Sequence, residues 1–414
     1  MRISKISAGN SDYRIWVLGF AVSVIALMAV WQSWFNDEVS IPSNEDFQVT
    51  VTSNIIPSKG HGFPPVLAYW ICGTKGDGKR MLRLLKAIYH PRNQYLLQLD
   101  ADSFDYERAE LLVSIQSETL FRAFGNVNVV GRNYGINKVG SSALAAILHA
   151  AALFLKLNKD WDWFINLSPV DYPLMTQDDL LHAIGSLPKD LNFIKYHSSQ
   201  SEWKERRSVD QIVIDPSLYL EKSSDLFYTV ERRRPDAFKI YGGSPWVILT
   251  RGIMEYCVQG WDNLPRKLVM YFSNVAYPIE SYFHTVLCNS PELKNKTINT
   301  DLSYNVAEES DYEKIVVSSG EAAFARPFKE GDLVLNKIDN DILNRPLNGV
   351  VPGNWCLGQA ITMNYTEEKK TTESWNLCET WGNVDAVKPG TSGVNLAVFL
   401  SNLQIDANSH CHPE

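Results

Sequence analysis

The chain has 414 residues, of which 45% are hydrophobic and 11% aromatic, so it can bury the core of one large domain or two coupled domains. That composition excludes an intrinsically disordered protein. The formal net charge of -8 gives no reason to expect nucleic acid as a partner, because phosphate binding requires clustered cations.

The N-terminal segment predicts a membrane anchor. An uncharged apolar run extends from Ile15 to Trp31, with basic residues before it and acidic residues after it. Because the positive flank stays in the cytosol, the pattern predicts a cytosolic tail (1–14), a single signal anchor (15–34) and a lumenal remainder that begins with a polar stem (35–62). A cleaved signal peptide is the competing interpretation.

The cysteines and glycosylation sequons fit a lumenal location. Six cysteines form an even set, which predicts disulfides in an oxidising compartment, and their irregular spacing without a CxxC pair argues against a zinc site. The connectivity stays open, although Cys356 and Cys378 are the nearest pair in the tail and Cys72 is predicted to be a buried strand thiol. The sequons at Asn295 and Asn364 are predicted glycosylation sites.

From residue 65 the sequence alternates between buried-strand and helix patterns. Strands are predicted over 66–72, 95–99, 127–130 and from 161, and helices over 79–89, 105–121, 141–157 and from 177. This order is typical of βαβ units, so the predicted fold class is α/β, with a Rossmann-type, mostly parallel sheet flanked by helices. The strand ends would bring Asp100, Arg132 and Asp171 to one rim, where open α/β sheets bind ligands.

Residues 161–181 contain the most informative of these strand ends. A run of bulky residues stops at a turn that presents Asp171 and Tyr172, and a helix restarts near Gln177. Local sequence leaves two interpretations of Asp171 open, a ligand contact or a cap for the turn. The glycine-rich loop at 73–79 lacks P-loop spacing and is predicted to be an ordinary loop.

Longer blocks of the sequence resemble a known family. The blocks are LLKAIYHPRNQYLLQLD (84–100), WDWFINLSPVDYPL (161–174), YGGSPWVILTRGIMEYC (241–257), GWDNLPRKLVMYFSN (260–274), ESYFHTVLCNSPE (280–292) and AFARPF (323–328). They resemble glycosyltransferase family 14, the core-2/I-branching enzymes, and particularly its plant β-glucuronosyltransferase-like branch.

The resemblance covers roughly Pro65 to Arg345 and carries several expectations. It implies a GT-A-like catalytic domain (63–345) in a single-pass type II protein of the Golgi membrane. It also implies a UDP-sugar donor, an inverting reaction, and no obligatory metal or other cofactor. Residues 346–414, with much Gly, Asn, Trp and Cys and little periodicity, are predicted to form a disulfide-tied appendage.

The resemblance also indicates a catalytic base. Inversion in one displacement needs a group that removes the proton of the acceptor hydroxyl as it attacks, a role worth about 10²- to 10⁴-fold. In the family a Glu just before an aromatic-rich helix has this role, and Glu280 occupies that position. The alternative is that Glu280 merely favours the helix N-terminus. His284, one turn later, is expected to face the core.

Donor-binding residues are implied in the same way. Asp100-Ala-Asp102 matches the sequence pattern of a metal-binding DxD motif. The resemblance instead implies that Asp100 contacts the nucleotide, and no metal is predicted. A cation must stabilise the charge that develops on the departing UDP. A segment similar to residues 324–328 supplies it in the family, so Arg326 is the predicted diphosphate partner and Lys329 a weaker one. The predicted donor-binding set is Asp100, Arg132, Asp171, Arg326 and Lys329.

Two segments are predicted to contact the acceptor. In the family a charged stretch equivalent to residues 201–207 lies beside the acceptor sugar, and the Gly-Gly-Ser-Pro-Trp segment at 242–246 allows close backbone approach. A solvated loop is the simpler account of the first segment, and Trp246 is interpreted as a core residue first. The predicted acceptor-binding residues are Glu202, Trp203, Lys204, Arg206, Gly243 and Trp246.

The predicted function is transfer of glucuronic acid from UDP to galactose-containing glycans such as arabinogalactan side chains, with N-acetylglucosamine or xylose as alternative donors. The segment between Tyr304 and Arg326 is shorter than in the plant relatives, so a catalytically inactive glycan-binding or scaffold protein is the second hypothesis. A glycoside hydrolase, which needs two opposed carboxylates at a defined separation, is the third.

Overall fold

The computed structural model describes most of the chain from residue 57 onward. The described residues are 39–40, 57–60, 62–131, 134–158, 160–207, 209–220, 222–260, 262–306, 311–357, 378, 380–405 and 411. The expected anchor at 15–34 lies outside them, as do Arg132 and the sequon residue Asn364. Within the described part, no helix has the length and apolar character needed to cross a membrane.

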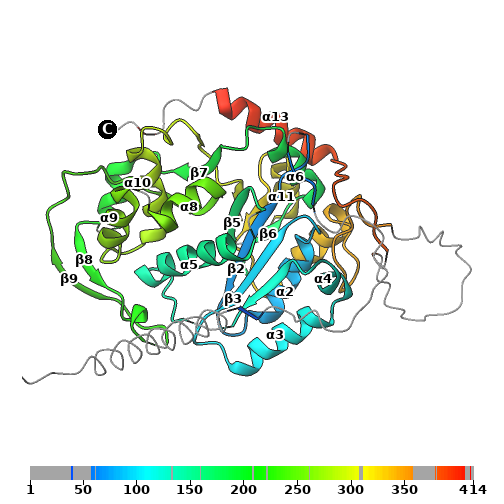
Figure 1. Ribbon diagram of the computed structural model, residues 1–414, viewed down its shortest axis with the longest axis horizontal. Coiled ribbons are helices and arrows are strands. Elements are labelled where there is room, and N and C mark those ends of the chain that lie inside the picture. The colour runs from blue at the N-terminus through cyan, green and yellow to red at the C-terminus, as the bar shows by residue number, and fades with distance from the viewer. Residues whose placement is uncertain are drawn as a thin grey trace, which may run out of the picture.

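A large mixed sheet forms the centre of the molecule (Figure 1). Its strands, in spatial order, are β1 (Val39–Ser40), β4 (Val127–Val130), β3 (Gln94–Leu99), β2 (Leu67–Gly73), β5 (Trp163–Leu167), β10 (Gly243–Thr250), β7 (Asn192–Tyr196) and β11 (Thr297–Ile298). The four strands β4, β3, β2 and β5 are mutually parallel, which confirms the predicted βαβ units. Strand β10 is inserted antiparallel between β5 and β7.

The helices that connect the parallel strands cover both faces of the sheet. They are α2 (Gly78–Ala87), α3 (Asp105–Ser117), α4 (Thr119–Phe124), α5 (Ser141–Leu157) and α6 (Gln177–Gly185). The single helix predicted over 105–121 is two helices, because Glu118 is extended, with φ -76° and ψ 117°. At the start of α5 the Asp215 carboxylate accepts a hydrogen bond from the Ser142 amide at 2.8 Å, so a distant side chain satisfies this helix end.

Successive side chains of a strand point to opposite faces of the sheet, so the core has two layers, one on each face. Leu67, Tyr69 and Ile71 of β2 belong to a cluster with α2, α3 and α6. Ala68 and Trp70 face the opposite side and pack in a second cluster with α5 and the later helices. The later helices are α8 (Arg251–Gln259), α9 (Asn263–Phe272) and α10 (Tyr282–Asn289), which gather beside α5 in Figure 1.

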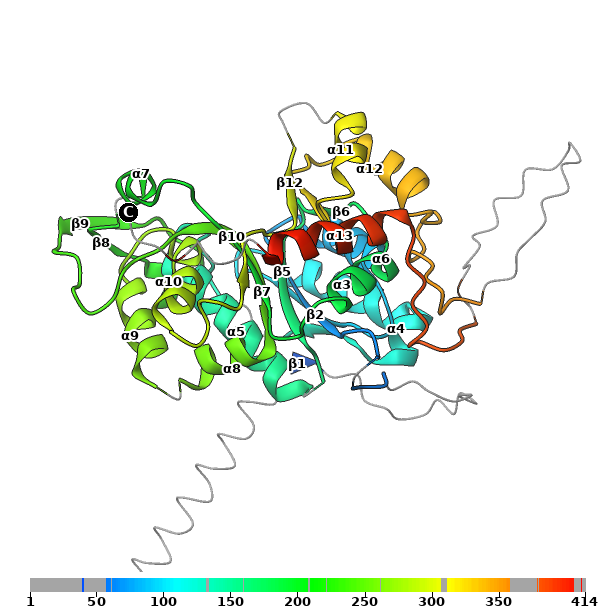
Figure 2. The same cartoon turned by 90° about the horizontal axis from the view of Figure 1, so that it is seen from above.

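Two small sheets flank the main one. Strands β12 (Ser303–Asn305), β13 (Phe324–Arg326) and β6 (Tyr172–Pro173) form the first, in the order β12-β13-β6. The second is the hairpin of β8 (Gln211–Ile214) and β9 (Phe227–Glu231), which follows helix α7 (Gln200–Arg206) and extends from the body in Figure 2. Further helical segments include the 3-10 turn Pro216–Leu218, α11 (Tyr312–Ser318), α12 (Val334–Lys337) and the π-helical turn Ile338–Ile342.

The C-terminal segment packs closely against the rest of the chain. Helix α13 (Thr391–Ile405) lies against α6 and buries Leu396 and Leu400 completely (Figure 2). Disulfides join Cys356 to Cys378, the pair nearest in sequence, and Cys288 to Cys411. Cys72, which was predicted to be a buried strand thiol, is free and only partly buried, and Cys257 is free and buried. The disulfides predicted for the tail are thereby confirmed.

Candidate active site

Asp100 lies at the carboxyl end of β3, at the rim where ligands bind in open α/β sheets. Its side chain is buried, and one carboxylate oxygen accepts hydrogen bonds from the Ser103 amide (3.2 Å) and hydroxyl (3.0 Å). Burial raises the pKa of Asp100, and it also raises the pKa of the neighbouring Cys72 thiol to about 12. The thiol therefore stays protonated and unreactive.

Arg326, the last residue of β13, is a deeply buried cation. It is only 2% exposed, and its guanidinium lies over the Trp246 ring, with 4.2 Å between Cζ and the ring centroid. Its Nε is 3.3 Å from Oδ1 of Asp171, which is itself 1% exposed. The other Asp171 oxygen accepts hydrogen bonds from the amide and hydroxyl of Ser168 at 2.7 and 3.1 Å.

This ion pair leaves part of the guanidinium without a partner. Among the described residues, neither Nε nor Nη1 of Arg326 has a hydrogen bond of acceptable geometry, and the same holds for Oδ1 of Asp171. Burial lowers the pKa of Arg326 and raises the pKa of Asp171, so for each partner the loss of solvation is the largest effect. A buried guanidinium with unfilled donors is suited to bind an anion that enters from outside.

A second carboxylate, Asp301, joins this group. Asp301 accepts a hydrogen bond of 2.6 Å from the Ser244 hydroxyl on β10, and its negative charge opposes the burial effect on the pKa of Arg326. Sequence reasoning missed this residue. Its position in the Thr300-Asp-Leu-Ser-Tyr304 segment, among the family-like blocks, is the signal that could have indicated it.

Glu280 ends a single 3-10 turn, Pro278–Glu280, that precedes α10. The turn begins after Tyr277, whose left-handed backbone (φ 54°) reverses the chain direction there. As a whole residue Glu280 is 8% exposed, and its carboxylate accepts two parallel hydrogen bonds from the Arg207 guanidinium, each 2.8 Å long. The Trp203 indole N–H donates a third at 3.3 Å.

Trp203 and two glycines fix the position of this carboxylate. Trp203 is 1% exposed, so it forms the buried wall behind Glu280. It packs so closely on Gly242 that a Cβ atom there would overlap its ring, and a Cβ at Gly243 would overlap the Lys195 carbonyl and the His284 ring. His284 is fully buried, as predicted, and its Nε2 lies 3.1 Å from the Lys195 carbonyl oxygen.

The first half of β10 and the residue before it contact one side chain of each group. Gly242, just before the strand, touches Trp203 on the Glu280 side, whereas Trp246 lies beneath Arg326. The intervening stretch of β10 is irregular, with a register shift against β7 between Gly243 and Val247. The negative charge of Asp301 opposes the effect of burial on the pKa values of both Arg326 and His284.

The other predicted site residues lie at the surface or outside the described set. Lys329 and Glu202 are exposed, while Lys204 is half-buried, and burial followed by the charge of Arg234 lowers its pKa. Asn295 is exposed in a turn, where a glycan can be attached. Arg132 and the side chain of Arg206 lie outside the described residues.

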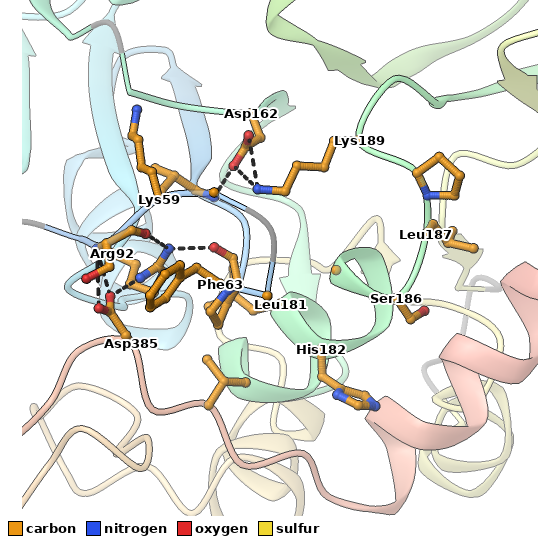
Figure 3. Close-up of a pocket in the computed structure, with 18 residues that line it drawn as sticks. Lys59, Phe63, Arg92, Asp162, Leu181, His182, Ser186, Leu187, Lys189 and Asp385 are labelled. Atoms are coloured by element: carbon orange, nitrogen blue, oxygen red, sulfur yellow. Dashed lines mark hydrogen bonds and ion pairs between the residues drawn. The ribbon is translucent and has the colours of Figure 1, made fainter.

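A large open cavity lies at the other end of the parallel strands (Figure 3). It has a volume of about 1080 Å³ and is lined by residues near the starts of β2 and β5, including Arg92, Asp162 and Lys189. Its charges are already matched, because Arg92 pairs with Asp385 and Lys189 lies 3.5 Å from Asp162. None of the predicted donor or acceptor residues lines it. Across the described residues, no group of three or more His, Cys, Asp or Glu side chains is arranged to hold a metal ion.

A mostly parallel α/β sheet with a buried cation and an oriented carboxylate at one rim is typical of an enzyme that transfers a group from an anionic donor. The family model described as Core-2/I-Branching enzyme matches residues 67–315, and the chain belongs to this family. The resemblance stated from sequence is thereby confirmed, and the protein is a glycosyltransferase.

Individual relatives are consistent with this family. The Arabidopsis thaliana proteins named β-glucuronosyltransferase GlcAT14A and GlcAT14C are 43% and 48% identical, over 82% and 76% of this chain and 76% and 81% of their own lengths. Human xylosyltransferase 1 is 34% identical over 55% of this chain and 22% of its own length. The apo structure of mouse xyloside xylosyltransferase 1 aligns with 63% of this chain and 97% of that chain at 10% identity, with a TM-score of 0.32, and we draw nothing from so distant a likeness.

Proposed function

We propose that this protein is an inverting β-glucuronosyltransferase that uses UDP-glucuronic acid and a galactose-containing acceptor, such as an arabinogalactan side chain. The observation that carries the proposal is a pair of groups: a buried Arg326 with unfilled donors, which lies over Trp246 of β10, and the oriented Glu280 carboxylate. The donor is inferred from the relatives of the chain that are named β-glucuronosyltransferases. The sheet, read with the family, supports a GT-A-like catalytic domain.

In this mechanism Arg326 binds the diphosphate of the donor. Negative charge grows on the UDP as its bond to the anomeric carbon breaks, and a fixed cation in a water-poor site stabilises that charge more strongly than water does. Asp171 holds the guanidinium in place, and Lys329, exposed three residues later, can reach the same phosphates. Asp100 contacts the nucleotide at the end of β3. Because Arg326 supplies the positive charge that stabilises the leaving group, the proposed mechanism uses no metal ion.

Glu280 acts on the acceptor. The acceptor hydroxyl attacks the anomeric carbon on the side opposite the UDP, its proton moves to the Glu280 carboxylate, and the UDP leaves with the electrons of the broken bond. Configuration at the anomeric carbon is inverted because only one displacement occurs. Trp203 and Gly242 keep the carboxylate at the wall of the site, and the exposed Glu202 and half-buried Lys204 lie on the same helix as possible acceptor contacts.

The location that we propose for the protein is the Golgi membrane, with the catalytic domain in the lumen. The uncharged segment at 15–34 supports a signal anchor, and two disulfides fit an oxidising compartment. Fusion of residues 1–40 to a fluorescent protein tests this. Golgi retention of the fusion is expected, and secretion would favour a cleaved signal peptide.

A second donor, UDP-xylose, is favoured by one finding, the similarity to human xylosyltransferase 1 over 55% of the chain. The second hypothesis for the protein as a whole is a non-catalytic glycan-binding role. The region between Tyr304 and Arg326, which prompted that hypothesis, holds helix α11 and places β12 and β13 side by side as parallel strands. The short segment between Tyr304 and Arg326 therefore does not prevent β13 from holding Arg326 in the site.

A donor screen tests the proposal. Purified residues 38–414 are offered UDP-glucuronic acid, UDP-xylose or UDP-N-acetylglucosamine together with galactan acceptors, with and without EDTA. We expect turnover with UDP-glucuronic acid that EDTA does not abolish. Turnover with UDP-xylose alone would change the donor, loss in EDTA would require a metal, and absence of UDP binding would favour the non-catalytic role. Release of free sugar from a glycan without nucleotide would indicate a hydrolase.

A further inference from the structure

The side chain of Arg207 connects the acceptor face of the site to the proposed base. It follows α7 directly, and its guanidinium makes two hydrogen bonds of 2.8 Å, from Nε to one oxygen of Glu280 and from Nη2 to the other. On its other face it lies over the Tyr277 ring, with 3.9 Å from Cζ to the ring centroid. We infer that Arg207 is a positioning residue, which holds the Glu280 carboxylate in a fixed direction and which an acceptor contacts before it reaches the base. The inference rests on the proposed function.

The hydrogen bonds between Arg207 and Glu280 restrict the orientation of both side chains more than a surface ion pair would. Two parallel N–H···O bonds from one guanidinium fix both the direction and the plane of a carboxylate. Glu280 is also held from behind by the Trp203 indole, and the ring of Tyr277 limits how Arg207 can turn. A lysine cannot reproduce this arrangement, because an ammonium group is a point donor without a planar fork.

Burial makes the pair costly to break. The Glu280 side chain is 10% exposed and the Arg207 side chain 34% exposed, so solvent and substrate meet the guanidinium first. A buried carboxylate that loses its partner is left without a counter-charge, which is strongly destabilising. Among the described residues, Arg207 is the charged group that contacts Glu280; His284, one turn along, faces the Lys195 carbonyl instead.

The pair also imposes an order of events. Both carboxylate oxygens accept hydrogen bonds from Arg207, so a hydroxyl that donates to Glu280 must displace or share one of them. Among the described residues, Nη1 of Arg207 makes no hydrogen bond, which leaves a donor for an oxygen of the acceptor sugar. An acceptor sugar bound to Nη1 would place its reacting hydroxyl beside the Glu280 oxygen that has lost its hydrogen bond to Arg207.

The test compares Arg207→Gln, Arg207→Lys and Glu280→Gln with the double variant and with Arg233→Gln. Arg233 is a matched control, because its side chain is 86% exposed and pairs with Asp236 at the surface. Each variant is measured for kcat and KM of transfer, for UDP binding and for Tm. We expect Arg207→Gln to lower kcat by about 10- to 100-fold with unchanged UDP binding.

Arg207→Lys should restore only part of kcat, since lysine returns the charge but not the planar pair of donors. An unchanged kcat in Arg207→Gln would overturn the inference. The Tm values test the pair without any turnover: the loss in Arg207→Gln should be partly recovered when Glu280→Gln is added, because no buried charge is then left alone. Additive losses would also overturn it. Absence of turnover in the unmodified protein, with coupled Tm values, would instead refute the proposed function and leave the pair intact.

Discussion

The buried cation Arg326 either binds the donor or only stabilises the fold. The variant Arg326→Met, compared with the double variant that also carries Asp171→Asn, tests which of these holds. Methionine keeps much of the packing over Trp246 and removes the charge. The single variant leaves Asp171 buried without a counter-charge, which costs about 3–5 kcal/mol when one partner of a buried pair is removed. At about 2 °C per kcal/mol, the Tm should fall by roughly 6–10 °C.

Adding Asp171→Asn to Arg326→Met removes the unpaired buried charge. The double variant should therefore regain most of the Tm that the single variant lost. Transfer should not recover, because the diphosphate then has no buried cation; we expect a loss of about 10²- to 10³-fold in kcat/KM in both variants. Differential scanning fluorimetry and initial rates with UDP-glucuronic acid give the two readouts. A double variant that regains both stability and transfer would refute our reasoning, because Arg326 would then be purely structural.

Three further outcomes are expected. Gly242→Ala should displace Trp203 and lower transfer at least about 10-fold, while Gly252→Ala, where a Cβ meets nothing within 4 Å, should leave transfer unchanged; equal effects on initial rates would contradict this. Burial lowers the pKa of His284 to about 3, so the unfolded chain binds a proton that the folded chain does not, and stability should fall by up to about 1.4 kcal/mol per unit as pH drops from about 6.5. The Tm of His284→Gln should change less between pH 7 and 5 than that of the unmodified protein, and an equal change would count against the assignment. Cys411→Ser opens a loop of 123 residues and should reduce the free energy of unfolding by roughly 3–5 kcal/mol in denaturant titrations, whereas no change would mean that this disulfide does not form.

The parallel half of the sheet could be predicted closely from sequence. The predicted strand 127–130 and helix 141–157 match β4 and α5 to the residue, because buried apolar runs and helical periodicity are local signals. Local signals also explain the error over 105–121. The apolar pattern continues through Glu118, and only its extended backbone separates α3 from α4.

The candidate site was predictable only in part, because its contacts join distant segments. Arg207 and Glu280 are 73 residues apart, and no local pattern says which cation of the charged stretch meets the carboxylate. Trp203 was predicted at the acceptor, and the structure buries it behind Glu280. Cys288 and Cys411 pair across 123 residues, which cysteine spacing leaves open. By contrast, the apolar pair Leu396 and Leu400 is an i, i+4 signal that could have indicated helix α13.

The most direct measurement of the central claim is sugar transfer by Glu280→Gln, with UDP binding measured on the same preparation. Glutamine keeps the size of the side chain and can still meet Arg207 and Trp203, but it cannot take a proton. The account predicts unchanged UDP affinity and a loss of transfer of about 10²- to 10⁴-fold. Transfer at the unmodified rate, with UDP still bound, would show that another group removes the acceptor proton.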